Sequence, residues 1–195
     1  MTLAIFDFDG TITTKDSFIQ FILFTHGELK TFFGTLALSP WIILYQLKKF
    51  PNWKLKEYTL TSFYHGMEEE VFKKLALDFA LDKIPPMVRP SAMEKIRWHK
   101  SQGHQVVIVS ASPENYLQLW CQANKLDLLA TKLQIENGQI TGLIDGKNCY
   151  GEEKVRRIKE KYNLADFEYI YAYGDSEGDK ALQQVANEFH YKIFK

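Results

Sequence analysis

The 195-residue chain lacks an excess of charge of either sign, because 24 lysines and arginines balance 24 aspartates and glutamates. A nucleic-acid partner requires a net basic surface, so this balance argues against one. Cysteine is scarce, and two cysteines are too few for a disulfide framework. The sequence has no internal repeat and no low-complexity segment. Its first residues include acids where a signal peptide needs a basic and then an apolar stretch, so we expect a cytoplasmic protein.

Apolar residues are abundant, at 46% of the chain against 25% charged residues, which is enough for a substantial core. Three short apolar runs, over residues 3–6, 105–109 and 169–173, predict buried strands. Helical patterns accompany them at residues 91–102, 113–125, 152–162 and 177–186. This alternation predicts a Rossmann-like α/β core of three layers, with a parallel sheet between helices.

The first two predicted strands are separated by roughly ninety residues, far more than one crossover helix needs, which predicts an inserted domain. Its patterns are helical, at residues 18–24, 40–49, 54–63 and 67–82, with breaks expected at Gly27, Ser39-Pro40, Pro51 and Pro85-Pro86. We therefore divide the chain into a catalytic core of residues 1–14 and 91–195 and an all-helical cap of residues 15–90. An Asn-Gly turn between alternating apolar residues predicts a hairpin over residues 135–140.

Polar side chains follow each predicted strand. The motif DFDGT at residues 7–11 places Asp7 and Asp9 after the first strand, Ser110 follows the second, and Asp175 follows the third. Parallel strands bind ligands outside their carboxyl ends, so these residues should converge on one crevice. A simple Asp-Gly turn with a surface acid would explain the first motif alone, but it would not explain the polar residues at the other strand ends.

These residue types suit phosphoryl transfer. Lys154 adds a positive charge and Asp179 a further carboxylate. An aspartate can accept a phosphoryl group as an aspartyl-phosphate if a cation and a lysine relieve the repulsion between the two anions. A site with only oxygen ligands favours Mg²⁺. The sequence therefore predicts a Mg²⁺-dependent phosphoryl-transfer site.

With these residues in place, the chain resembles the haloacid dehalogenase superfamily, and within it subfamily IB, the phosphoserine-phosphatase-like hydrolases with a helical C1 cap. That family's first motif, DxDxT, matches residues 7–11. The resemblance implies that Asp7 is the nucleophile and that Asp9 is the acid and base. It also implies that Asp7 binds Mg²⁺ and that Asp9 offers the ion its main-chain carbonyl.

The remaining family motifs fall on Ser110, on Lys154 and on the acidic segment GDSEGD at residues 174–179. By resemblance, Ser110 and Lys154, together with Thr11 of the first motif, bind the phosphoryl group. Asp175 then ligates Mg²⁺ directly, and Asp179 holds it through water or neighbouring groups.

Two of these assignments have competitors. Ser112 competes with Ser110, although its place before Pro113 suits a helix N-cap with Pro113 as the first helical residue. Lys147 competes with Lys154, and we prefer Lys154 because it opens the helix of the Gly-Glu-Glu-Lys run, as the family's lysine does.

The sequence says less about the substrate than about the catalytic residues. Asp16 lies nine positions after Asp7, where phosphoserine phosphatases carry a glutamate that binds the substrate's amino group, and we assign Asp16 to substrate specificity. The leading prediction is a phosphomonoester hydrolase that acts on a small phosphorylated metabolite. The alternatives are a phosphoserine phosphatase, a membrane-associated lipid phosphatase resembling phosphatidylglycerophosphatase C, and a phosphate-binding module without catalysis.

Residues 31–47, TFFGTLALSPWIILYQL, form a run of 17 uncharged residues flanked by lysines. The run could be cap core, a contact with an anionic lipid surface, or a membrane span, for which its length is at the lower limit. Because Gly34 and Ser39-Pro40 divide it, a helical hairpin in the cap fits at least as well as a membrane helix.

Overall fold

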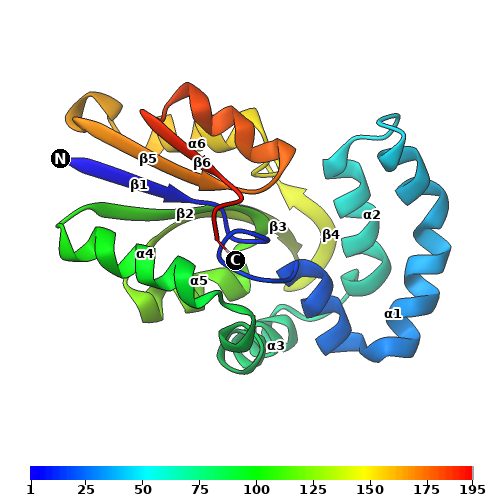
Figure 1. Ribbon diagram of the computed structural model, residues 1–195. Helices are drawn as coiled ribbons and strands as arrows, with labels where there is room; N and C mark the ends of the chain where they lie inside the picture. Colours follow the sequence, from blue (N-terminus) through cyan, green and yellow to red (C-terminus); the bar gives the residue numbers. More distant parts are fainter. Residues whose placement is uncertain (195) are drawn as a thin grey trace.

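The computed structural model describes residues 1–194 and is built on one six-stranded sheet (Figure 1). The strands are β1 (Thr2–Phe6), β2 (Gln105–Pro113), β3 (Asp127–Glu136), β4 (Gln139–Asp145), β5 (Tyr169–Gly174) and β6 (Glu188–Tyr191). Their order is β4-β3-β2-β1-β5-β6, and only the β3–β4 pair is antiparallel. The predicted Rossmann-like sheet is confirmed, with β1 at its centre.

Helices cover both faces of this sheet (Figure 1). The helices α4 (Pro90–Ser101) and α5 (Glu114–Asn124) lie on one face, and α6 (Glu152–Lys161) and the 3₁₀ helix η3 (Glu177–Gln184) lie on the other. Successive side chains of a strand point to opposite faces. Accordingly, Ala4 and Phe6 of β1 join one buried cluster, whereas Leu3 and Ile5 join the other. This burial on both sides explains why the strands read as continuous apolar runs.

The inserted segment forms α1 (Ser17–Gln46), α2 (Asn52–Tyr64), α3 (Glu69–Asp82) and a short 3₁₀ helix, η1 (Pro85–Met87). The expected break at Gly27 is present as a kink, where this glycine has a φ of +74°. The expected break at Ser39-Pro40 is wrong, because α1 continues through Pro40. Pro40 and Leu36 are both exposed, so water can replace the hydrogen bond that proline cannot make. The cap hairpin is therefore formed by α1 and α2, not within residues 31–47.

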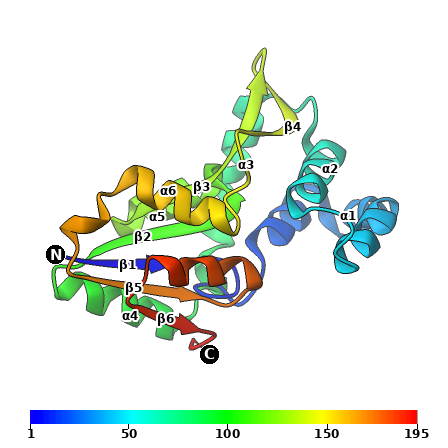
Figure 2. The same cartoon turned by 90° about the horizontal axis from the view of Figure 1, so that it is seen from above.

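The cap contacts the core mainly through α2 and α3. Helix α2 packs against the outer half of α1 and against β4, and α3 packs against α5. The β3–β4 hairpin projects from the sheet toward α2 and α3 (Figure 2). The N–H of Gly66, in the connection between these helices, donates to the carbonyl of Ile140 at 2.9 Å, and the N–H of Glu69 in α3 donates to that of Gly138 at 2.8 Å. The Asn137-Gly138 turn has the two positive φ angles of a tight hairpin, as the sequence predicts. The division at residues 15 and 90 stays a prediction.

Candidate active site

The ends of β1 and β5 lie side by side at the carboxyl edge of the sheet. The backbone N–H of Asp7 donates to the carbonyl of Tyr173 at 2.9 Å. The chain then turns at Gly10, where φ is +80°. The Thr11 hydroxyl donates to the Asp175 carboxylate at 3.3 Å. The predicted convergence of these strand ends is therefore present in the structure.

Lys154 lies between two buried carboxylates, those of Asp7 and Asp179. Its ammonium is 2.5 Å from Asp7 Oδ1 and 2.6 Å from Asp179 Oδ1, and all three side chains are buried. Burial raises the pKa of Asp7 well above its usual range, with Lys154 opposing the shift. The competing residue, Lys147, is exposed. The first turn of α6 thus delivers Lys154 to Asp7.

Asp179 is held by more than Lys154. Its second oxygen accepts bonds from the Ser176 hydroxyl at 2.6 Å and from the Ser176 N–H at 2.9 Å. Burial alone would raise the pKa of Asp179, but Lys154 and these bonds keep it below its usual range. Asp179 is therefore a fixed anion that positions the Lys154 ammonium beside Asp7.

The charge balance and the donor set fit a divalent cation. Oxygens of Asp7, Asp175 and Asp179 lie within 4.8 Å of one another. When ionised, the three carboxylates carry three negative charges against one positive charge on Lys154. Two negative charges therefore remain uncompensated. Burial and the neighbouring Asp179 accordingly raise the pKa of Asp175. An all-oxygen set with this residual charge suits Mg²⁺. Both Asp179 oxygens already accept hydrogen bonds, so Asp7 and Asp175 are the better direct ligands.

The Asp9 carboxylate points away from this cluster. It accepts bonds from the N–H of Ser17 and from the Ser112 hydroxyl, both at 2.6 Å. Burial, and then the charge of Asp16, raise the pKa of Asp9 to about 6, against the effect of these two bonds. A carboxyl group that titrates near neutral pH can both give and take a proton. Asp9 is thus suited to acid–base work.

The expected N-cap role of Ser112 is wrong. Strand β2 continues to Pro113, which itself occupies the N-cap position of α5, and no side chain caps that helix. The Ser112 hydroxyl instead donates to the Asp9 carboxylate. A hydrogen bond to an ionised carboxylate is stronger than the bond between neutral groups that a serine N-cap makes. Ser110 is fully buried, and its hydroxyl oxygen accepts the N–H of Ser112 at 3.0 Å. Both serines therefore line the end of β2.

Asp16 has a structural role in addition to any contact with a substrate. It is exposed and is the N-cap of α1, where its carboxylate accepts the N–H of Ile19 at 2.9 Å. The bond explains the residue's place in the sequence without reference to a ligand. Its charge nevertheless acts on Asp9.

Lys56 is a residue at this site that the sequence reasoning missed. It extends from α2 of the cap and donates to the carbonyl of Ala111, between Ser110 and Ser112, at 2.7 Å. Burial lowers its pKa, although Asp16 and Asp9 act in the opposite direction. In the sequence, Lys56 is one of several lysines beside the apolar run, and no local pattern separates it from them. Only the packing of α2 shows that it points inward.

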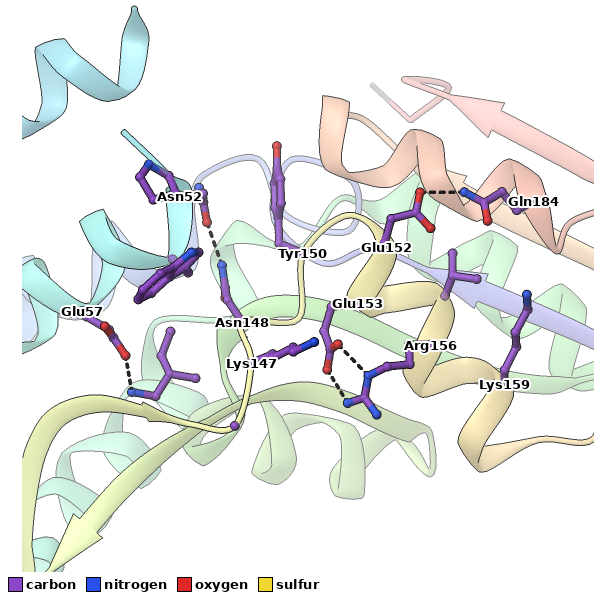
Figure 3. Close-up of a pocket in the computed structure, with 15 residues that line it drawn as sticks. Asn52, Glu57, Lys147, Asn148, Tyr150, Glu152, Glu153, Arg156, Lys159 and Gln184 are labelled. Atoms are coloured by element: carbon purple, nitrogen blue, oxygen red, sulfur yellow. Dashed lines mark hydrogen bonds and ion pairs between the residues drawn. The ribbon is translucent and has the colours of Figure 1, made fainter. Parts of the chain in front are cut away.

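A cleft of about 980 Å³ opens between α2 and the start of α6 (Figure 3). Tyr150 stands within it, and a 2.7 Å bond from Asn148 to Asn52 links the core to the cap at one side. The residues that line this cleft do not include Asp7 or Asp9. The carboxylate cluster therefore lies outside this cleft, although Asp9 and Asp175 are partly exposed.

A family described as haloacid dehalogenase-like hydrolase matches residues 4–183. The chain belongs to this family. The expected family is thus confirmed, and with it the expectation of a hydrolase.

Individual proteins align over most of the chain. Protein CicA of Caulobacter vibrioides is 36% identical over 195 residues, which cover 99% of this chain and 86% of CicA. A probable phosphatase of Mycobacterium tuberculosis is 29% identical over 195 residues, covering 94% of this chain and 66% of that protein.

Solved structures share the fold. A protein of unknown function from Bordetella pertussis has a TM-score of 0.83 at 24% identity, covering 96% of this chain and 88% of that one. A phospho-aspartyl intermediate analogue of phosphoserine phosphatase has a TM-score of 0.66 at 21% identity, covering 96% of this chain and 84% of that one. Within residues 1–194, none of the helices has the length and apolar character required to cross a membrane.

Proposed function

We propose that the protein is a Mg²⁺-dependent phosphatase that hydrolyses a small phosphorylated metabolite through an aspartyl-phosphate on Asp7. The observation that carries this proposal is the buried contact of Lys154 with both Asp7 and Asp179, beside Asp175. A buried lysine there offsets the negative charge that an incoming phosphate adds. The named phosphatase relative and the phosphoserine phosphatase fold support the same chemistry.

In the first half of the reaction, a carboxylate oxygen of Asp7 attacks phosphorus and the ester P–O bond breaks. Protonated Asp9 gives its proton to the leaving oxygen, which departs as an alcohol. In the second half, Asp9 takes a proton from water as the water oxygen attacks phosphorus. The bond between Asp7 and phosphorus then breaks, and inorganic phosphate is released.

The remaining residues hold the phosphoryl group and its charge. Ser110, Lys154 and Thr11 are assigned to its oxygens. Asp7, Asp175 and the main-chain carbonyl of Asp9 are assigned to Mg²⁺, which would neutralise charge between the nucleophile and the phosphate when bound. The contact of Lys56 with Ala111 closes the cap over this site, which excludes water during the transfer.

The two alternative substrates are less well supported. Asp16, the residue assigned to an amino group of phosphoserine, is engaged as the N-cap of α1. A lipid phosphate is the second alternative, and its support is limited to the apolar surface of the cap. A small soluble phosphomonoester needs neither feature, so it remains the preferred class.

Phosphate release by the purified protein tests this proposal. The panel should contain soluble phosphomonoesters, among them phosphoserine, and phosphatidylglycerophosphate in detergent, each with Mg²⁺ and with excess EDTA. We expect Mg²⁺-dependent release from a soluble ester and loss of that release in Asp7→Asn. Asp145→Asn, at an exposed position on β4, is the matched control. Undiminished turnover in EDTA would exclude the metal, and a preference for the lipid would exclude the soluble class.

A further inference from the structure

The outer half of α1 presents an apolar stripe to solvent. Its members lie three, four, seven, 14 and 18 positions after the first of them, offsets that keep all of them on one helix face. They are Leu29, Phe32, Phe33, Leu36, Ile43 and Leu47, and each is between 54% and 78% exposed. We call these six residues the α1 stripe. Large contiguous apolar surfaces of this kind mark interaction sites.

The opposite face of the same helix is already in use. Thr31 and Leu38 are buried, and Gly34 lies so close to α2 that a Cβ built on it would be 2.3 Å from the Phe63 ring. Helix α2 thus covers the inner face of α1 and leaves the α1 stripe on the outside. Figure 1 shows this part of α1 at the edge of the molecule, with α2 between it and the sheet. The cap-core interpretation of residues 31–47 therefore holds for the inner face alone.

Within residues 29–56 the charges along the α1 stripe are all positive, and the exposed Glu28 adjoins the segment at Leu29. Residues 29–56 contain no aspartate or glutamate, although the whole chain is neutral. The segment holds five lysines, and four of them are exposed, namely Lys30, Lys48, Lys49 and Lys54. Lys30 lies at one end of the stripe, and the others lie at the other end, in or near the turn into α2. A partner for this surface must be apolar and negatively charged.

Aromatic side chains gather at the lysine-rich end. The rings of Trp41, Phe50 and Tyr58 lie 5.1 to 5.5 Å apart, with Trp41 and Tyr58 partly exposed. Trp53 is also exposed, with the Lys54 ammonium 5.4 Å from its ring. Tryptophan, tyrosine and lysine are the residues that favour the boundary between lipid and water.

We propose that the α1 stripe docks the protein on an anionic membrane surface, with α1 lying in the plane of the interface. The apolar side chains enter the lipid boundary, and the four exposed lysines contact anionic headgroups. Pairing with a second copy of the chain fits less well. Because the segment carries lysines at both ends and no acid, parallel and antiparallel pairing both bring lysine against lysine.

Docking of this kind is independent of the proposed catalysis. Helix α2 separates the α1 stripe from β4, and its Lys56 points inward to β2. The stripe and the carboxylate cluster therefore lie on different sides of the cap. The membrane is inferred as a partner for the cap, and the substrate need not be a lipid.

Sedimentation with vesicles tests the docking. We expect the full-length protein to sediment with vesicles of equal phosphatidylcholine and phosphatidylglycerol, and far less with phosphatidylcholine alone. The double variant Phe32→Ser/Phe33→Ser should lose at least about tenfold in partitioning. Lys48→Gln/Lys49→Gln should lose about tenfold as well, and high salt should weaken the wild type. Leu81→Ser, a similarly exposed leucine on α3, is the control and should bind normally.

Two further measurements keep the outcomes distinct. Thermal unfolding should show that each variant is folded, and Asp7→Asn should bind vesicles like the wild type whether or not the protein is a phosphatase. Equal sedimentation of wild type and the double phenylalanine variant would overturn the proposal. So would a dimer in sedimentation velocity that the same variant converts to a monomer, because the α1 stripe would then be a self-association surface.

Discussion

A Cβ added to Gly10 would lie 2.2 Å from a carboxylate oxygen of Asp175. The turn after β1 and the acid after β5 are therefore packed so closely that only glycine fits between them. Gly10 also has a φ of +80°, which other residues adopt at a cost. This contact joins the DFDGT motif at residues 7–11 to the acidic segment at residues 174–179, across more than half of the chain.

Gly10→Ala should impair both stability and turnover. We expect a loss of about 2 to 4 kcal/mol in the free energy of unfolding, from backbone strain and the clash together. Turnover should fall on the order of a hundredfold, because displaced Asp175 no longer holds its position. Gly103→Ala is the control, since Gly103 has a similar φ of +73° with nothing within 4 Å of the added methyl group. Equal effects of the two substitutions in urea unfolding and phosphate release would contradict the close contact.

Lys154→Met should remove the only cation in direct contact with Asp7 and Asp179 among the described ion pairs. Breaking a buried ion pair costs about 3 to 5 kcal/mol, and protonation of Asp7 should keep the loss near the lower value. Phosphate release should fall by at least about a hundredfold. Lys147→Met alters an exposed lysine nearby and should change the unfolding free energy by less than about 0.5 kcal/mol. Near-normal activity in Lys154→Met would remove the central support for the site.

His99 should make the protein less stable in mild acid. This buried histidine contacts His104 at 2.8 Å and the Tyr173 hydroxyl at 2.9 Å, and burial lowers its pKa to about 3. Below the unfolded value near 6.5, the unfolded chain binds a proton that the folded chain does not. Stability is therefore full above pH 6.5 and falls as the pH is lowered toward 3, by about 2 kcal/mol between pH 7 and 5.

The measurement is urea unfolding at pH 7 and at pH 5 for wild type and His99→Leu. The variant should be less stable at pH 7, because it leaves Tyr173 without its partner, but its stability should change less between the two pH values. His65→Leu, at an exposed histidine, is the matched control variant. An unchanged slope in His99→Leu would assign the acid sensitivity to other groups.

Lys56→Gln should weaken the closed state of the cap. The substitution removes a partly buried ammonium that bonds to Ala111 beside the proposed phosphate site. We expect KM for an anionic substrate to rise about tenfold, with a smaller change in kcat. Lys54→Gln, exposed on the same helix, should leave both values near wild type with a soluble substrate. An unchanged KM in Lys56→Gln would show that this lysine does not act on the substrate.

The sequence predicted the parts of the site that follow from strand order. Asp7, Ser110 and Asp175 end apolar runs, and parallel strands must bring such ends together. It failed at Ser112, because an N-cap is judged from neighbours in sequence, whereas the Asp9 acceptor lies in the turn after β1, far away in the sequence. The break predicted at Pro40 was wrong for a similar reason. The cost of a proline within a helix depends on whether water reaches the carbonyl that lost its hydrogen bond, and this depends on tertiary structure. Lys56 was not identifiable, because only the docking of α2 decides which lysine points inward.

The central claim, that Asp7 accepts the phosphoryl group, is tested most directly by trapping the intermediate. The protein should be acid-quenched during turnover and treated with borohydride, which reduces an acyl phosphate to an alcohol and so converts a phosphorylated aspartate to homoserine. Peptide mapping by mass spectrometry then locates the change. We predict homoserine at position 7, dependent on substrate and absent from Asp7→Asn. Rapid turnover with homoserine at another aspartate, or at none, would contradict the assignment of Asp7 as the nucleophile.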